Sequence, residues 1–140
     1  MDCVFCEIIN GIVPKYTIYE DEHTLAFLDI VNDVDGHTIV IPKKHVESML
    51  DCDNDTLFQI VNTVKLLSTY YAENCGYQGV NLLNANGKAA QQSVPHFHIH
   101  IIPRKNDDGI DAWPVFDEAH ESIAAMQTKL KYNKLYMNGK

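Results

Sequence analysis

Three histidines that alternate with hydrophobic residues near position 100 place the strongest constraint on the fold of this chain. His96, His98 and His100 occupy every second position, and hydrophobic residues lie between them. Side chains of a β-strand point alternately to its two faces. The segment 93–104 therefore predicts a strand with three imidazoles on one face, spaced at about 7 Å. Such a row is unusual on a solvated surface. It indicates a functional site, built either on a nucleophilic histidine or on a bound metal ion.

Length and composition limit the class of protein. The chain has 140 residues, 46% of them hydrophobic, so we expect one domain over residues 1–140, with 105–140 as a C-terminal extension or tail. No hydrophobic run is long enough to cross a membrane, and the N-terminus lacks the basic and hydrophobic regions of a signal peptide. We therefore expect a cytoplasmic protein with reduced or metal-bound cysteines. A net charge of −8 argues against a nucleic acid polymer as partner.

The remaining pattern predicts short strands around one long helix. Hydrophobic residues recur at helical spacing from Leu57 to Tyr71, after the candidate N-caps in 51–55 and before Gly76. The other expected elements are a short helix at 5–10, strands at 17–20, 24–29, 38–41 and 79–83, a loop at 84–92 and a helix at 118–130. Short links between neighbouring strands predict an α+β fold: an antiparallel sheet of about five strands with one long helix and one or two short ones.

A Cys-x-x-Cys pair lies at the start of the chain. Alone it is compatible with a metal site, a redox site or chance. Because no strand precedes it, a thioredoxin-like redox site is disfavoured. His45 follows the third expected strand and His96 begins the histidine strand, so Cys3, Cys6, His45 and His96 would complete a tetrahedral, structural Zn²⁺ site. The alternative is a frayed N-terminus with one thiol in the core.

The segment 96–102 also fits the pattern of the histidine triad (HIT) family, in which three histidines alternate with hydrophobic residues. Segments 26–30, 36–45, 84–87 and 92–94 resemble the other signatures of that family, in the same order. The resemblance extends from Cys3 to about Arg104. The chain resembles the Hint-type branch that carries an N-terminal Cys-x-x-Cys, which implies a HIT-like fold.

This resemblance implies a nucleotide-binding homodimer that acts at the α-phosphorus of nucleoside phosphoramidates, adenylates or dinucleoside polyphosphates and releases a nucleoside monophosphate. His98 matches the nucleophile, which would form a nucleotidyl-histidine and so divide one difficult step into two. His100 can donate a hydrogen bond to the phosphate or to the bridging atom. A nucleophilic imidazole is neutral, and we expect a backbone carbonyl near His96 to accept the hydrogen of its other nitrogen.

The resemblance also implies how a purine nucleotide, with an AMP or GMP moiety, would be held. Asp29 matches the acceptor for the ribose hydroxyls, and His37 supports the site. Phe5, Phe27 and Ile30 would line the base, although plain core packing is an alternative for all three. Backbone N–H groups and Ser93 would hold the phosphate, with Asn84 favoured over Asn86. The full set implied for nucleotide binding is Phe5, Phe27, Asp29, Ile30, His37, Asn84, Gln92, Ser93 and Val94.

Two other functions compete with this one. In the first, zinc on His96, His98 and His100 would activate water for hydrolysis, which leaves the match at Asp29 unused. In the second, the protein is a catalytically slow nucleotide-binding module that acts through a protein partner. Dimer contacts are expected along the long helix and the strand at 79–83.

Overall fold

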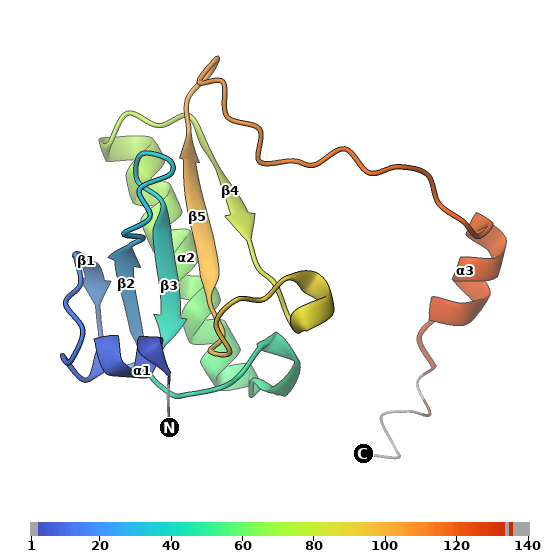
Figure 1. The fold of residues 1–140 in the computed structure, drawn as a ribbon, viewed down its shortest axis with the longest axis horizontal. Coiled ribbons are helices and arrows are strands. Elements are labelled where there is room, and N and C mark those ends of the chain that lie inside the picture. Colours follow the sequence, from blue (N-terminus) through green and yellow to red (C-terminus); the bar gives the residue numbers. More distant parts are fainter. Residues whose placement is uncertain (1–2, 134, 136–140) are drawn as a thin grey trace. The chain divides into compact units, whose positions relative to one another are not determined.

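The computed structural model describes residues 3–133 and 135, and the chain divides into two units, Met1–Ile110 and Asp111–Lys140. The first unit contains a sheet with α1 and α2, and the second contains α3 (Ile123–Leu130) (Figure 1). α3 begins five residues later than the helix expected at 118–130. The reason is local, because the Ser122 side chain accepts a hydrogen bond from the N–H of Ala125 and so caps the helix there. A single domain with an extension from residue 105 stays a prediction.

The sheet of the first unit has five strands, and every neighbouring pair is antiparallel. They lie in the order β1-β2-β3-β5-β4, with β3 in the centre. Their bounds are β1 Thr17–Glu20, β2 Thr24–Leu28, β3 Thr38–Pro42, β4 Gly79–Leu83 and β5 Ile99–Arg104. The predicted antiparallel α+β fold is therefore confirmed.

Helices cover the two faces of this sheet. α2 (Asn54–Asn74) packs on one face, where its side chains Ile60, Val64 and Leu67 join a buried cluster with Ala26 and Val40. α1 (Val4–Ile9) packs on the other face. The cluster under α1 contains Cys3, Phe5, Ile8, Leu25, Phe27, Ile39 and Ile41. Successive residues of β2 and β3 thus enter opposite clusters, as the period of two requires.

The hydrogen-bonded part of the histidine strand is shorter than expected. β5 begins at Ile99, so His100 lies within the sheet while His96 and His98 precede it. The N–H of Phe97 donates to the carbonyl of Val46 at 2.8 Å instead of to a neighbouring strand. The alternation of faces nevertheless continues beyond the ladder: Phe97 lies in the cluster under α2, whereas the rings of His96 and His98 both contact Phe5 in the cluster under α1. His100 pairs with Ile39 of the same α1-side cluster and lies beside His98, so the predicted placement of the three imidazoles on one face is confirmed.

The length and hydrophobicity of the helices show whether any of them could cross a membrane. Within residues 3–133 and 135, none of the helices is both long and hydrophobic enough to span a bilayer.

Candidate active site and metal centre

Two thiols and two imidazoles converge beside α1. The Sγ atoms of Cys3 and Cys6 and the Nδ1 atoms of His45 and His96 all lie within 4.8 Å of one another. The two Nδ1 atoms are 3.1 Å apart, and Cys6 Sγ lies 3.3 Å from His45 Nδ1. Zinc bonds of about 2.0–2.3 Å place the ligand atoms of a tetrahedral site roughly 3.3–3.8 Å apart. The spacing of this cluster therefore fits a zinc ion, and the four residues predicted from the sequence are brought together.

The hydrogen bonding of His96 supports a role as metal ligand. Its Nε2 lies 2.9 Å from the carbonyl oxygen of Pro42, which can only accept, so Nε2 carries the hydrogen. Nδ1 therefore presents its lone pair to the cluster, as a metal-ligating imidazole does. The side chain is fully buried, and this burial lowers the pKa of His96. Both nitrogens are thus engaged. Neither ring nitrogen of His96 is therefore free to bind a zinc ion together with His98 and His100, which argues against the three-histidine zinc site.

His98 has the hydrogen-bond arrangement that a nucleophilic imidazole requires. Its Nδ1–H donates to the backbone carbonyl of His96 at 2.7 Å, which confirms the predicted acceptor. Nε2 therefore carries the lone pair. Burial lowers the pKa of His98, which keeps the ring neutral at pH 7. The ring of Phe5 packs edge-on against it, with centroids 5.1 Å apart. Phe5 thus also fixes the orientation of His98.

His100 lies next to His98 and belongs to a second hydrogen-bonded group. The two rings are 4.9 Å apart. His100 Nδ1 lies 2.9 Å from His37 Nε2, and His37 Nδ1 lies 2.8 Å from an Asp33 carboxylate oxygen. The sequence indicated only a turn at 33–36 and no role for Asp33. The one sequence feature that could have indicated a role for Asp33 is its position four residues before His37, a candidate site residue.

The turn before His37 explains why these side chains meet. Gly36 has φ +76, a conformation that favours glycine. A Cβ atom there would also lie 3.0 Å from a side-chain carbon of Pro103. Since the chain reverses at this point, Asp33 and His37 face each other although they do not share a helix.

Burial lowers the pKa of His100 to about 4. In the unfolded chain a histidine binds a proton below about pH 6.5, whereas folded His100 resists protonation down to about pH 4. The unfolded state therefore binds more protons in this window, and stability falls as the pH drops through it. We expect the free energy of unfolding of His100→Asn to depend less steeply on pH than that of the wild type, by up to about 1.4 kcal/mol per pH unit. Urea denaturation at several pH values measures this difference, and parallel profiles would contradict it.

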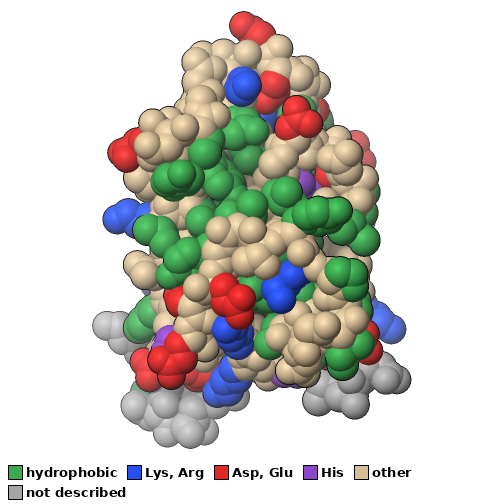
Figure 2. Space-filling view, turned by 90° about the vertical axis from the view of Figure 1, so that its left-hand side faces the viewer, with side chains coloured by type: hydrophobic (Ala, Val, Ile, Leu, Met, Phe, Trp, Pro, Cys, Tyr) green, Lys and Arg blue, Asp and Glu red, His purple; other side chains and the backbone are tan. Residues whose placement is uncertain are grey.

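A hydrophobic cavity of about 150 Å³ opens between α1 and β2. The sequence analysis named four of its lining residues, Phe5, Phe27, Asp29 and Ile30. Phe5 and Phe27 are also core residues, with ring centroids 5.7 Å apart, so the two readings of these side chains are compatible. Seven further lining residues were not assigned from the sequence: Val4, Ile8, Val13, Pro14, Lys15, Leu28 and Ile39. On the side of the protein turned to the viewer in Figure 2, hydrophobic side chains form a broad area between charged ones.

Asp29 lies where the cavity approaches the histidines. One of its carboxylate oxygens is 3.8 Å from His37 Nε2, and the other accepts a hydrogen bond from the N–H of Val31 at 2.9 Å. Ile30 is 80% exposed, so it forms the outer edge of the cavity. A carboxylate between a hydrophobic cavity and two imidazoles can bind the polar part of a ligand whose other part is hydrophobic.

The residues expected around the phosphate lie in the loop before β5. Asn84 Nδ2 donates to the carbonyl of His98 at 2.9 Å, so this amide supports the backbone of the nucleophile. The Gln92 side chain links Gly87, Glu47 and Val94 through their backbone groups, which braces the loop. Ser93 is exposed and Val94 packs against the cluster under α1. Phosphate binding by these four residues stays a prediction.

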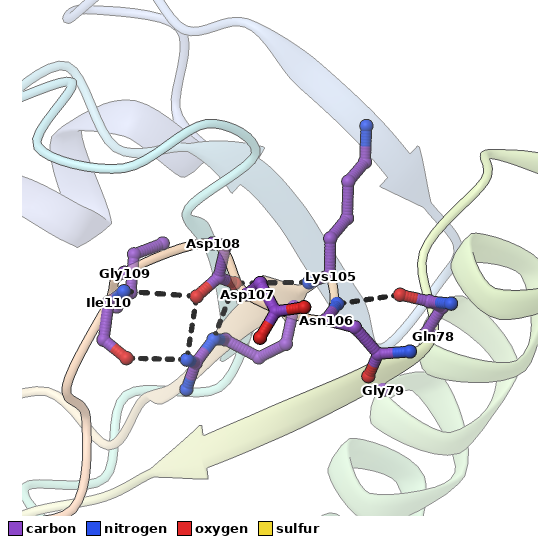
Figure 3. Close-up of a pocket in the computed structure, with 9 residues that line it drawn as sticks. Gln78, Gly79, Lys105, Asn106, Asp107, Asp108, Gly109 and Ile110 are labelled. Atoms are coloured by element: carbon purple, nitrogen blue, oxygen red, sulfur yellow. Dashed lines mark hydrogen bonds and ion pairs between the residues drawn. The ribbon is translucent and has the colours of Figure 1, made fainter.

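A second, polar hollow lies at the far end of β5. Figure 3 shows its lining, which comes from residues 78–79 and 104–110. Arg104 donates to both carboxylate oxygens of Asp108, at 2.9 and 2.8 Å, and to Asn81. These acceptors lie within the protein, and the three histidines are not among the lining residues. This hollow is therefore separate from the candidate active site.

The antiparallel sheet and the adjacent imidazoles of His98 and His100 define an α+β protein of the histidine triad type. Residues 10–107 match the HIT domain model, and the chain belongs to the HIT family. It is 47% identical over 107 residues to a HIT-like protein of Methanocaldococcus jannaschii, covering 76% of this chain and 82% of that protein. It is 36% identical over 128 residues to the adenosine 5′-monophosphoramidase of Schizosaccharomyces pombe, covering 90% and 93%. A Zn-bound histidine triad family protein from Mycobacterium smegmatis has a similar structure, with a TM-score of 0.76, 37% identity and coverage of 84% and 85%.

Proposed function

We propose that this protein is a nucleotide hydrolase that acts at the α-phosphorus of nucleoside phosphoramidates, adenylates or dinucleoside polyphosphates. The observation that carries the proposal is the hydrogen bond from His98 Nδ1–H to the carbonyl of His96, because it directs a lone pair on Nε2 outward from a neutral ring. The similarity to an adenosine 5′-monophosphoramidase over nine-tenths of the chain supports the substrate class.

The proposed reaction has two steps. His98 Nε2 forms a bond to phosphorus while the bond to the leaving group breaks, and His100 supplies a proton to that group. Water then attacks the nucleotidyl-His98, and a nucleoside monophosphate leaves. A covalent intermediate of this kind replaces one difficult displacement by two easier ones. Backbone N–H groups near Gln92, Ser93 and Val94 would stabilise the charge on the phosphoryl oxygens.

A turnover assay with adenosine phosphoramidate tests this function. We expect repeated release of AMP, with a rate that depends on enzyme concentration. Rates close to the uncatalysed background, with nucleotide still bound, would instead favour the slow nucleotide-binding module.

Asp29 is proposed to accept hydrogen bonds from both ribose hydroxyls. Because its side chain is only 17% exposed, loss of a charged acceptor there should be costly. We expect Asp29→Asn to lower kcat/KM for adenosine phosphoramidate by about 10- to 100-fold. The matched control is the 2′,3′-dideoxy analogue, for which the variant and the wild type should differ little. Equal losses with both substrates would show that Asp29 does not contact the ribose.

We propose that a structural Zn²⁺ binds the Sγ atoms of Cys3 and Cys6 and the Nδ1 atoms of His45 and His96. The ion would join α1, the segment after β3 and the segment before β5. Burial raises the pKa of the Cys6 thiol, so the positive charge of a bound ion would be needed to stabilise the thiolate. The Zn-bound relative from Mycobacterium smegmatis supports this proposal.

The protein is also proposed to act as a homodimer. β4 is an edge strand whose Leu82 and Leu83 are 51% and 39% exposed. The outer side of α2 exposes Phe58, Val61, Leu66 and Tyr70. Edge strands and exposed hydrophobic areas of this kind are commonly covered by a partner. We expect light scattering to give twice the chain mass of 15.9 kDa, and a monomer at micromolar concentration would contradict the proposal.

A cytoplasmic location, and the absence of membrane and nucleic acid partners, complete the proposal. The net charge of −8 supports the last point, because a nucleic acid polymer repels an acidic protein.

A further inference from the structure

A row of hydrogen bonds leads from a surface carboxylate to two histidines, of which His37 is buried and His100 is half-buried. Asp33 Oδ1 lies 2.8 Å from His37 Nδ1, and His37 Nε2 lies 2.9 Å from His100 Nδ1. The Asp33 side chain is 52% exposed, whereas that of His37 is 9% exposed. The row therefore connects a solvated negative charge to an imidazole at the candidate active site.

The positions of the hydrogens follow from the chemistry of the partners. The hydrogen bond with His37 lowers the pKa of Asp33, so this carboxylate is ionised and only accepts. His37 Nδ1 must then carry a hydrogen. The contact between His37 Nε2 and His100 Nδ1 holds one hydrogen, which can belong to either ring.

The His37–His100 pair can exist in two states, which differ in the ring that holds the shared hydrogen and in whether His100 Nε2 carries a hydrogen. In the first, the shared hydrogen belongs to His37, which is then an imidazolium, and neutral His100 carries its own hydrogen on Nε2. In the second, the hydrogen belongs to His100 Nδ1, His37 is neutral, and His100 Nε2 has a lone pair. The first state can give a proton to a leaving group, and the second can take one from water. The two states differ by one proton.

We propose that Asp33 is a positioning residue that fixes the hydrogen of His37 on Nδ1 and so turns Nε2 towards His100, which lets the His37–His100 pair supply and recover the proton of the reaction. This inference rests on the proposed function, since it assigns the proton transfers of that reaction. His37 becomes the proton reservoir, and His100 is the group that touches the substrate.

The transfers balance over one turnover. As His98 Nε2 bonds to phosphorus, the leaving group departs with its electron pair and takes the hydrogen of His100 Nε2. His100 Nδ1 then takes the shared hydrogen from His37. In the second step, His100 Nε2 takes a hydrogen from water as the water oxygen bonds to phosphorus. The bond from phosphorus to His98 breaks, its electron pair returns to His98, and the shared hydrogen returns to His37.

Asp29 also faces His37 but is less suited to this task. Its oxygen is 3.8 Å from His37 Nε2, beyond hydrogen-bond distance. Asp33 makes the direct bond, and it does so to the nitrogen that does not face His100. Its charge therefore orients His37 without competing for the shared hydrogen.

Asp33→Asn tests the proposal, because it keeps an acceptor oxygen and removes the charge. The control is Asp35→Asn, which removes another exposed charge from the same turn. Two substrates are compared. Adenosine phosphoramidate has a basic leaving group that needs a proton, whereas the p-nitrophenyl ester of AMP has one that does not. We expect Asp33→Asn to lower kcat for the amidate by about tenfold, with the burst of nitrophenolate from the ester changed less than about twofold. Equal effects on both substrates, or none, would overturn the proposal.

Nuclear magnetic resonance of ¹⁵N-labelled histidine rings provides a readout that does not need turnover. In the wild type and in Asp35→Asn, His37 should carry its hydrogen on Nδ1. In Asp33→Asn, the ring shifts of both His37 and His100 should change. Unchanged ring shifts would contradict the role of Asp33. A wild type that hydrolyses neither substrate would refute the proposed function, and the ring shifts would then decide on Asp33 independently.

Discussion

His98→Ala is expected to abolish hydrolysis of adenosine phosphoramidate, with a loss in kcat of roughly 10⁴-fold or more, because it removes the atom that bonds to phosphorus. The hydrogen bond from His98 Nδ1–H to the His96 carbonyl leaves the lone pair of the ring on Nε2, which is the atom that would attack phosphorus. The variant should still fold, since the His96 ring that joins the metal cluster is unchanged. Steady-state kinetics with measured zinc content test both statements.

His23→Ala is the matched control, because His23 has a side chain that is 51% exposed. It should retain wild-type activity. If His98→Ala kept more than about a hundredth of the activity, another group would have to be the nucleophile. His100 would be the first alternative, since its ring is 4.9 Å away.

Loss of the metal cluster is the second large effect we expect. Cys6→Ser should abolish binding of the proposed zinc ion and lower the free energy of unfolding by about 3 kcal/mol or more, since metal binding to a structural site is coupled to folding. Activity should fall as well. The same His96 residue contributes a ring nitrogen to the cluster and a carbonyl oxygen to His98, so a displaced His96 misplaces the nucleophile.

Cys52→Ser serves as the control for this experiment. Cys52 is also half-buried but lies outside the cluster. Its replacement should leave zinc content and activity unchanged. A Cys6→Ser protein with wild-type stability and activity, measured by urea denaturation and by kinetics, would contradict a structural role for the metal.

Local sequence patterns predicted the sheet well. The strand at Gly79–Leu83 has the expected bounds, and α2 begins after Asp53, whose side chain accepts from the N–H of Thr56. Such features depend on residues close in sequence. The start of β5 could not be predicted in this way, because it is set by the contact of Phe97 with Val46, which lies fifty-one residues earlier.

The candidate site was also predictable in part. Alternating histidines and the Cys-x-x-Cys pair identified the residues, and the fold brings them together. The hydrogen-bond partners of the rings were harder to predict, since they depend on which atom each ring nitrogen meets. Asp33, for which the sequence indicated no role, reaches His37 only because Gly36 reverses the chain. Gln92 shows the same limit, because its amide braces the loop through distant backbone groups.

The most direct test of the central claim is a rapid-quench intact mass measurement on the wild-type protein mixed with adenosine phosphoramidate. We predict a transient mass increase of one adenylyl group per chain, which peptide mapping assigns to His98 and which is absent from His98→Ala. An adenylyl group mapped to another residue would contradict the account. So would steady release of AMP with no adduct at any quench time, even with a substrate whose leaving group departs rapidly.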